Sequence, residues 1–230
     1  NAIVLYHGGE PLLNGKFVEM VKAVRPLCNK IKTVSNGTLI NRQRAKEIAL
    51  SGIDEITVSI DGSSANENDQ IRIGSKFEQL KEAVMLLAEE SVGTKLQIIV
   101  SNSDPSVQAK DFMRREFAGL QASVLLRQNR FIVWPAQLLG SKQNRFLNNR
   151  CDKLDETMTI RWNGDIVPCC YDLASQSVMG NILNQSLEEI WNGEKYATFR
   201  KKIEEKNPPD MCRSCLVLTA PAHAYREETI

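Results

Sequence analysis

Four cysteines in the last third of the chain have a spacing that suits a metal centre. Cys151 and Cys169 follow the pattern C-x12-G-x4-C, and Cys212 and Cys215 form a later C-x2-C pair. Thiolates are the ligands that iron–sulfur clusters and zinc prefer. A structural zinc site more often uses two short pairs. The pattern therefore favours an iron–sulfur cluster, with zinc or an empty thiol site as the alternatives.

The residues between these cysteines predict how they converge. Asn163-Gly164 separates Thr157–Trp162 from Asp165–Cys169, and we expect a β-hairpin with a type I′ turn. This hairpin would bring Cys169 back beside Cys151. Helical patterns then lead toward the C-x2-C pair, over Ser186–Trp191 and Lys195–Ile203.

The two other cysteines are expected to be packing residues. Cys170 directly follows Cys169, and alternation along a strand points its side chain to the opposite face. Cys28 stands alone in the first half of the chain, where a buried cysteine behaves as a small apolar residue.

A second stretch that could form part of a functional site is Gly8-Gly9-Glu10-Pro11, which follows an apolar run. The glycines allow a sharp turn and a close approach to a ligand, and Pro11 fixes the direction of the exit. Glu10, held at the end of a strand, can accept hydrogen bonds from an ammonium group. The simpler interpretation is a tight loop with a solvated glutamate.

Polar residues also close the later strands: Asn36, Ser59, Asp61 and Asn102. Alternation places Ser59 and Asp61 on one face, so both can point into a site. They can equally cap the following loop, and Asn102 can form an Asx turn before Pro105. We expect a polar loop over residues 66–74, which contains Arg72.

The elements that position these residues alternate between apolar strands and amphipathic helices. The expected strands are Ala2–Tyr6, Ile31–Ser35, Glu55–Ile60, Lys95–Val100 and Ser123–Leu126, and the expected helices are Lys16–Val24, Arg42–Leu50, Phe77–Glu90 and Ser106–Phe117. This alternation implies an α/β fold with parallel strands and right-handed crossovers. The pattern does not separate a doubly wound sheet from part of a barrel.

The alternation stops after residue 126, and we place a domain boundary after residue 140. The predicted domains are residues 1–140 and 141–230. Arg127 and Arg130 follow the last strand and could reach the mouth of a barrel, where they could contact substrate or remove a proton. Most arginines in such positions are solvated or pair with surface carboxylates.

Composition bounds the possible partners and location. The chain has 230 residues and a net charge of +1, so no strong field attracts nucleic acid or an anionic membrane. No apolar run approaches the ~20 residues that span a bilayer. Six cysteines are too few for a disulfide scaffold of this size. We therefore expect a cytoplasmic protein with no nucleic-acid or membrane partner.

Three of these motifs resemble those of radical S-adenosylmethionine (SAM) enzymes, in that family's order: Gly8-Gly9-Glu10-Pro11, Ser35-Asn36-Gly37-Thr38 and Val58-Ser59-Ile60-Asp61-Gly62. The resemblance implies a partial (β/α)6 barrel that lacks its first βα unit, with SAM as cofactor. It places Gly8, Gly9, Glu10 and Pro11 at the methionine amino group. It places the polar residues of the later strand ends near the ribose: Asn36, Ser59, Asp61 and Asn102.

The cysteine pattern resembles the Twitch form of the SPASM extension of the same family. That extension is a small C-terminal domain with a β-hairpin and a helix, and it binds one auxiliary [4Fe–4S] cluster. The resemblance implies that the ligands are Cys151, Cys169, Cys212 and Cys215.

The family's C-x3-C-x2-C loop, which holds the primary [4Fe–4S] cluster, has no counterpart in this sequence. A segment cut after the first βα unit explains this better than a lineage that lost the cluster. We therefore expect the primary cluster only in the full-length protein, and no SAM cleavage by the chain as given.

The resemblance implies an oxidoreductase that abstracts a hydrogen atom with a 5′-deoxyadenosyl radical. We expect oxidation of a small alcohol or sugar-like substrate, with the auxiliary cluster as electron acceptor and flavodoxin or ferredoxin as reductant. One alternative is a SPASM-type maturase that modifies a peptide substrate. Another is a non-catalytic scaffold that binds a metal.

Overall fold

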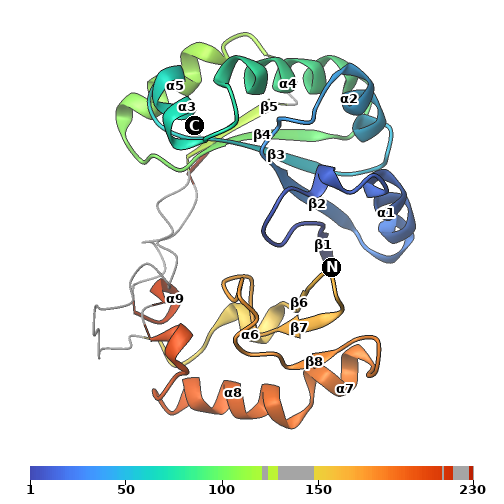
Figure 1. Ribbon diagram of the computed structural model, residues 1–230, viewed down its shortest axis with the longest axis vertical. Coiled ribbons are helices and arrows are strands. Elements are labelled where there is room, and N and C mark those ends of the chain that lie inside the picture. The colour runs from blue at the N-terminus through green and yellow to red at the C-terminus, as the bar shows by residue number, and fades with distance from the viewer. Residues whose placement is uncertain (121–123, 129–147, 214, 220–227, 230) are drawn as a thin grey trace. The chain divides into compact units, whose positions relative to one another are not determined.

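The computed structural model describes residues 1–120, 124–128, 148–213, 215–219 and 228–229, and Figure 1 shows the helices and strands within each part. It divides into two compact units, residues 1–131 with 227–230, and residues 132–226. The predicted boundary after residue 140 lies outside the described residues and stays a prediction.

The first unit is built on a six-stranded sheet in the order β1-β2-β3-β4-β5-β9. Its strands are β1 (Ala2–Val4), β2 (Lys30–Ser35), β3 (Glu55–Ile60), β4 (Gln97–Asn102), β5 (Val124–Gln128) and β9 (Glu228–Thr229). The first five are parallel neighbours in chain order, and β9 pairs antiparallel with β5. A doubly wound sheet reverses its strand order, whereas a barrel wall does not. The sheet is thus the wall of a partial barrel, and the predicted α/β class is confirmed.

Helices cover one face of this sheet. The first unit contains η1 (Pro11–Leu13), α1 (Phe17–Val24), η2 (Arg25–Leu27), α2 (Arg42–Ala49), α3 (Ala65–Ile71), α4 (Phe77–Glu90) and α5 (Val107–Glu116). In Figure 1, α2, α4 and α5 lie along the same side of the strands. This arrangement leaves the carboxyl ends of β1 to β4 at one edge, where the polar residues of the motifs gather.

The polar loop expected over residues 66–74 is wrong, because most of it forms α3. The hydroxyl of Ser64 accepts from the amide of Glu67 (3.2 Å), and the Glu67 carboxylate accepts from the amide of Ser63 (2.9 Å). This is close to a capping box, a start signal for a helix. The signal is present in the sequence, but the polar composition of the segment concealed it.

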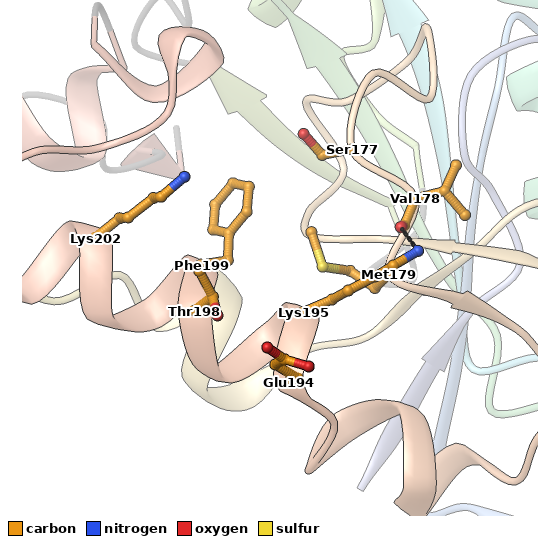
Figure 2. Close-up of a pocket in the computed structure, with 8 residues that line it drawn as sticks. All are labelled: Ser177, Val178, Met179, Glu194, Lys195, Thr198, Phe199 and Lys202. Carbon is orange, nitrogen blue, oxygen red and sulfur yellow. Dashed lines mark hydrogen bonds between the residues drawn. The ribbon is translucent and has the colours of Figure 1, made fainter.

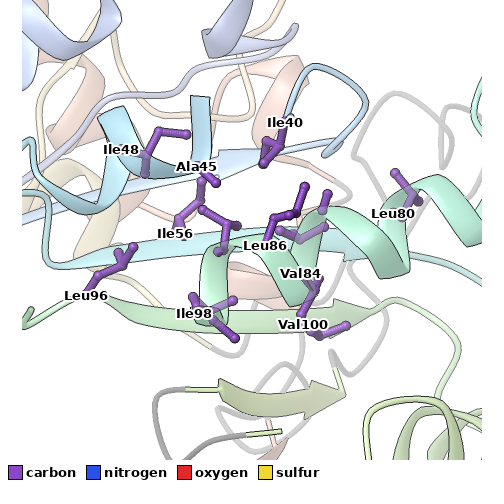
Figure 3. Packing of buried hydrophobic residues seen from close by; sticks show 14 of the residues in the cluster. Ile40, Ala45, Ile48, Ile56, Leu80, Val84, Leu86, Leu96, Ile98 and Val100 are labelled. Carbon is purple, nitrogen blue, oxygen red and sulfur yellow. The ribbon is translucent and has the colours of Figure 1, made fainter. Parts of the chain in front are cut away.

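The core of the first unit lies between α4 and the central strands. Leu80, Val84 and Leu87 of α4 are fully buried in one cluster with Ile56 and Ile98. Figure 3 shows Leu80 and Val84 beside these strand residues. Each fully buried aliphatic side chain of this kind contributes about 1.5–3 kcal/mol. The packing fixes β3 and β4, whose ends carry Asp61 and Asn102.

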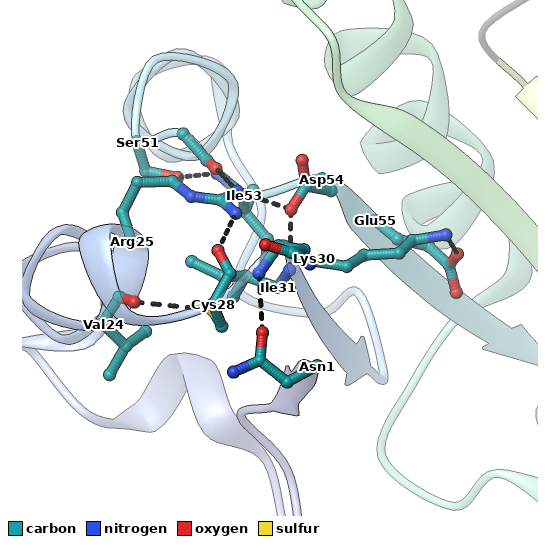
Figure 4. A network of polar contacts seen from close by, with 12 residues as sticks. Asn1, Val24, Arg25, Cys28, Lys30, Ile31, Ser51, Ile53, Asp54 and Glu55 are labelled. Carbon is teal, nitrogen blue, oxygen red and sulfur yellow. Dashed lines mark hydrogen bonds and ion pairs between the residues drawn. The ribbon is translucent and has the colours of Figure 1, made fainter.

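Cys28 packs at the start of β2, as the sequence predicts. Its side chain is buried, and its thiol donates to the carbonyl of Val24 (3.4 Å). Figure 4 shows the polar network around it, in which Arg25 reaches the Cys28 carbonyl (2.6 Å) and Asp54 (2.6 Å). Asp54 also accepts from the amide of Ile31 (2.6 Å), so this network fixes the start of β2.

The second unit contains a three-stranded antiparallel sheet and five short helices among the described residues. Its strands are β6 (Thr159–Ile160), β7 (Asp165–Val167) and β8 (Gly180–Asn181), and its helices are α6 (Asp152–Glu156), α7 (Leu187–Trp191), α8 (Glu194–Glu204), η4 (Asp210–Cys212) and α9 (Leu216–Thr219). The hairpin and helices α7 and α8 were predicted, whereas α6, β8, η4 and α9 were not.

The hairpin does not have the predicted type I′ turn. Among the described residues other than glycine, only Ser175 and Lys206 have a positive φ, so Asn163 does not. The amide of Gly164 donates to the carbonyl of Arg161 (3.0 Å), and Gly164 has a φ of +84°. This is a three-residue loop that ends in a left-handed glycine. The Asn163 side chain donates to the Asp165 carboxylate (2.7 Å), which helps hold this alternative turn.

A separate core holds the second unit together. Its buried residues are Leu154, Ile166, Met179, Ile190, Tyr196, Phe199, Ile203 and Leu218. They come from α6, β7, the residue before β8, and helices α7, α8 and α9, so the segments that carry the cysteines share one core. Across the described residues of both units, no helix has the length and apolarity needed to cross a membrane.

Candidate metal centre and cofactor site

Four cysteines of the second unit line one cavity. Cys151 precedes α6, Cys169 follows β7, and Cys212 and Cys215 flank the turn between η4 and α9. The other described lining residues are Lys153, Leu154, Pro168, Tyr171, Phe199, Val217 and Leu218. Three segments that are far apart in the sequence therefore bring their thiols to a common space, as the hairpin argument predicts. Cys170 is not among the described lining residues.

The chemistry of the four thiols suits an iron–sulfur cluster or a zinc ion. Among the described residues, no group of three or more His, Cys, Asp or Glu side chains is placed to hold one metal ion. Tetrahedral zinc would need all four sulfurs at about 2.3 Å from one point. A [4Fe–4S] cluster takes one thiolate at each of four separate irons. The cavity that these residues line has a volume of about 20 Å³.

The thiols are buried but meet backbone donors. Burial raises the pKa of Cys169 to about 12, and it also raises the pKa values of Cys151, Cys212 and Cys215. Backbone amides oppose this rise at three of them: those of Lys153 and Leu154 at Cys151, that of Tyr171 at Cys169, and those of Val217 and Leu218 at Cys215. Amide donors stabilise thiolates and tune cluster ligands. The donor set therefore fits an iron–sulfur cluster.

Helix α8 ties the first two cysteine segments together through Arg200 and Tyr196. Arg200 donates to the carbonyl of Leu154 (3.2 Å) and to that of Trp191 (2.9 Å). Its guanidinium also lies 4.2 Å from the centroid of the Trp191 ring. The Tyr196 hydroxyl donates to the carbonyl of Val167 (3.3 Å), two residues before Cys169. Sequence reasoning missed these supports, because only the tertiary fold brings the partners together.

The loop after Cys169 is organised by Asp172, which is buried. Its carboxylate accepts from the amides of Gln176 (2.8 Å) and Ser177 (2.9 Å), and its own amide donates to the carbonyl of Cys169 (3.1 Å). The hydrogen bonds to this carboxylate hold the loop between β7 and β8 in place beside the cavity.

In the first unit, Glu10 joins the ends of β1 and β2. Its Oε1 accepts from the amide of Leu12 (3.0 Å) and the hydroxyl of Ser35 (2.9 Å). Its Oε2 accepts from the amide of Asn36 (2.7 Å). Glu10 is therefore not simply solvated, because its carboxylate cross-links two of the predicted motifs.

The glycines before Glu10 make the turn possible. Gly8 and Gly9 have φ angles of +70° and +73°, in the left-handed region that side chains disfavour. Pro11 begins η1, where its missing amide costs no hydrogen bond. This geometry presents the backbone of residues 8–10 at the carboxyl end of β1, as the predicted cofactor contact requires. The contact itself stays a prediction.

The ends of β3 and β4 meet through Asp61. Arg72 Nε lies 2.7 Å from Asp61 Oδ2, and the hydroxyl of Ser103 donates to the same carboxylate. Ser59 is half-buried and pairs in register with Ser101 on β4. Ser59 and Asp61 thus lie at the sheet edge that also carries Asn36. Their contact with the cofactor stays a prediction.

Asn102 takes part in an Asx turn, which was the alternative to a cofactor contact. Its side chain is fully buried, its amide donates to the carbonyl of Gly62 (2.8 Å), and its oxygen accepts from the amide of Asp104 (2.9 Å). The bond from the Asp104 amide is that of an Asx turn, and the bond to Gly62 joins the ends of β4 and β3. Arg127 lies half-buried on β5, while Arg130 lies outside the described residues. The substrate roles of both arginines stay predictions.

A hollow of about 290 Å³ lies outside the cysteine cavity, between residues 177–179 and α8. Figure 2 shows Phe199 and the two lysines that line it, Lys195 and Lys202. Lys195 donates to the carbonyl of Val178 (3.1 Å). Phe199 also lines the cysteine cavity, so one ring borders both spaces. The hollow has no predicted ligand.

Two family models match the chain. Residues 2–113 match the radical SAM superfamily, and residues 151–216 match the SPASM iron–sulfur cluster-binding domain. The first match covers strands β1 to β4 of the partial barrel, and the second covers the segment that holds all four cavity cysteines.

Curated relatives with matching sequences include three proteins of different described activity. A tungsten-containing aldehyde ferredoxin oxidoreductase cofactor-modifying protein of Pyrococcus furiosus is 24% identical over 86% of this chain and 69% of its own length. The SAM-dependent 2-deoxy-scyllo-inosamine dehydrogenase of Niallia circulans is 37% identical over 23% of this chain and 22% of its own. The mycofactocin maturase MftC of Mycobacterium ulcerans is 24% identical over 90% and 65%. The chain thus spans about two thirds or less of their lengths.

A solved structure shares the fold. BtrN in complex with AdoMet and 2-DOIA superposes with a TM-score of 0.60 and 19% identity, over 94% of this chain and 72% of that one. This likeness supports the partial barrel with its appended second unit.

Proposed function

The chain belongs to the radical SAM superfamily and carries a SPASM domain, and from this premise we propose that it is part of an oxidoreductase. Its substrate would be a small alcohol or sugar-like molecule that loses a hydrogen atom to the SAM-derived radical, the hydroxyl proton to a base, and an electron to the auxiliary cluster. The observation that carries this proposal is the convergence of four cysteines from three segments on one cavity.

The two domains imply SAM and [4Fe–4S] clusters as cofactors. When bound, these groups supply a carbon-centred radical that takes a hydrogen atom, and a one-electron acceptor. The protein's part is to hold both groups and to exclude water. Cys151, Cys169, Cys212 and Cys215 would bind the auxiliary cluster through their thiolates. Four protein ligands leave no iron open for substrate, which favours an electron-transfer role.

Glu10 would orient the amino group of SAM. A carboxylate offers about four acceptor positions, and the chain itself uses three of them at Glu10. The three hydrogen bonds that Glu10 accepts from described residues leave room on Oε2 for an ammonium donor. The left-handed glycines before it leave the backbone uncovered by side chains. Asn36, Ser59 and Asp61 would lie near the ribose.

Cluster content tests the proposed centre directly. The chain, reconstituted with iron and sulfide without oxygen, should bind about four irons and four sulfides. Cys212→Ala should lose most of this iron because it removes a covalent ligand. Cys170→Ala and Cys28→Ala are matched controls that should retain it. Unchanged iron in the Cys212 variant would refute the ligand assignment.

A peptide-modifying maturase is the second candidate, since the mycofactocin maturase matches 90% of the chain. Both candidates would draw electrons from a reductant such as flavodoxin or ferredoxin in the cytoplasm. The full-length protein, supplied with SAM and a reductant, distinguishes them by product. A ketone formed from an amino-sugar alcohol supports the dehydrogenase. A mass change confined to a supplied precursor peptide supports the maturase.

A further inference from the structure

The outer hollow between residues 177–179 and α8 has the size of a small-molecule site. Its volume of about 290 Å³ lies near the lower end of the ~300–1,000 Å³ that such pockets usually span. All the residues that line it belong to the second unit, and none of them is a cysteine. The hollow is therefore separate from the candidate cluster ligands.

Both walls of the hollow are held in place by hydrogen bonds. On the loop side, the amide of Ser177 donates to the buried Asp172 (2.9 Å), and the amide of Met179 donates to a carbonyl of β7 (2.8 Å). Across the hollow, the ammonium of Lys195 on α8 donates to the carbonyl of Val178 (3.1 Å). A space that is formed in advance loses little conformational freedom when a ligand enters it.

The lining combines apolar surface with ammonium groups. Met179 and Phe199 are buried, and with Val178 they form the apolar part of the lining. In the view of Figure 2, the Phe199 ring lies between the side chains of Lys202 and Lys195. Apolar surface with a few polar groups around it is typical of pockets that bind small organic molecules.

The charges in the lining favour a ligand with a single negative charge. The lining contains the ammonium groups of Lys195 and Lys202 and the carboxylate of Glu194, so one positive charge is in excess. No residue that the structure describes forms an ion pair or hydrogen bond with the Lys202 ammonium. A carboxylate matches this excess, whereas a phosphate monoester carries about 1.5–2 negative charges at pH 7 and would be repelled by Glu194.

We propose that this hollow binds a small organic carboxylate, with its apolar body against Met179 and Phe199 and its charged group at Lys202. A hydrogen bond between an ammonium and a carboxylate is stronger than one between neutral groups. Lys195 keeps its bond to Val178 and adds a second positive charge to the lining. The inference does not depend on the proposed function, because no candidate ligand of the cluster takes part in it.

The test uses benzoate as the probe and the reconstituted chain as the protein. Two matched compounds separate the parts of the proposal. Benzamide keeps the ring without the charge, and acetate keeps the charge without the ring. Titrations followed by nuclear magnetic resonance give the dissociation constants. We expect the dissociation constant of benzoate to be about tenfold lower than those of benzamide and acetate, because only benzoate makes both kinds of contact.

Variants of α8 locate the binding site. Lys202→Gln should raise the dissociation constant of benzoate about tenfold and leave that of benzamide unchanged, and Lys202→Arg should restore most of the loss. Thr198→Phe places a ring in the hollow and should abolish saturable binding of benzoate. The controls are Lys201→Gln and Ala197→Phe, at exposed positions of the same helix outside the lining. Both should bind benzoate as wild type does.

Three results would overturn the inference. They are the absence of saturable benzoate binding by wild type, equal affinity for benzoate and benzamide, and unchanged benzoate affinity in both Lys202→Gln and Thr198→Phe. Iron content and circular dichroism show whether each variant is folded. If Thr198→Phe does not fold, the two Lys202 variants still decide the question, because they change only an exposed side chain. None of these results bears on iron binding by the wild-type chain, which tests the proposed function separately.

Discussion

Glu10 has a structural role that precedes any contact with a cofactor. Its carboxylate accepts three hydrogen bonds, one within its own turn and two from the end of β2. A glutamine keeps one acceptor oxygen but turns an amino group toward another donor. An unsatisfied buried donor costs about 1–3 kcal/mol.

Glu10→Gln should therefore lower the free energy of unfolding of the first unit by about that amount, as measured by urea denaturation. Glu82→Gln, on the exposed side of α4, is the matched control and should change it little. Equal stability of the Glu10 variant and wild type would show that the carboxylate is not the link between the strands.

Glu55 makes the stability of the first unit depend on pH. Burial alone would raise the pKa of its carboxyl, but Lys30 (3.0 Å) and Lys32 (3.4 Å) outweigh burial and lower it from its ordinary value of 4.5. A lowered folded-state pKa contributes stability above the unfolded-state value. That contribution is lost as pH falls through the folded-state value.

Wild type should therefore lose stability on acidification below about pH 4.5 more steeply than Glu55→Gln. Urea denaturation at a series of pH values measures both slopes, and other carboxylates contribute equally to the two proteins. Parallel slopes would mean that the lysines do not bias this carboxyl.

At the scale of elements, the sequence predicted those strands and helices that a pattern of consecutive residues determines. The strands β2 to β4 and helix α4 were predicted because runs of β-branched residues and a 3.6-residue period of apolar residues can be recognised in the sequence itself. The turn at Asn163-Gly164 was mistaken, because the side chain of Asn163 bonds to Asp165 and favours a different loop. The convergence of four cysteines was predicted from the hairpin, although its turn type was wrong.

Arg200 shows what the sequence could not reveal. An arginine on the last long helix gives no sign that it will hold a carbonyl of α6, 46 positions away. The same holds for Asp172, whose carboxylate organises a loop without a recognisable pattern. Such contacts depend on which segments the core brings together, and that information is not local.

The Arg200 link between α6, α7 and α8 yields a prediction at this scale. Arg200→Met keeps much of the apolar stem but removes the donors to Leu154 and Trp191. We expect the second unit to lose about 1–3 kcal/mol. The variant should also retain less iron after reconstitution, because α6 follows Cys151.

Thermal unfolding and iron analysis test the Arg200 prediction together. Lys201→Met is the control, since Lys201 is exposed and its ion pair with Glu205 spans 3.8 Å at the surface. Such pairs contribute little. If both variants behave alike, the guanidinium does not couple the cysteine segment to α8.

At the scale of the whole molecule, the two units have separate hydrophobic cores. The first core contains residues of the barrel wall and its helices, and the second contains residues of α6 to α9 and the small sheet. All four candidate ligands belong to the second unit. Metal binding adds its free energy to the fold that holds the ligands. Removal of the cluster should therefore destabilise the second unit much more than the first.

The tryptophans make this prediction measurable. Trp162 and Trp191 belong to the second unit, and the residues assigned to the first unit, 1–131 and 227–230, contain no tryptophan, so tryptophan fluorescence does not report on the first unit. Circular dichroism at far-ultraviolet wavelengths reports on helices of both. After the reconstituted chain is treated with a chelator and an oxidant, the fluorescence transition should move to a lower temperature. A second transition in the dichroism signal should stay where it was, because the barrel wall holds none of the ligands. If both signals shift together by the same amount, the units unfold as one cooperative block, and the stability of the barrel wall depends on the cysteine centre.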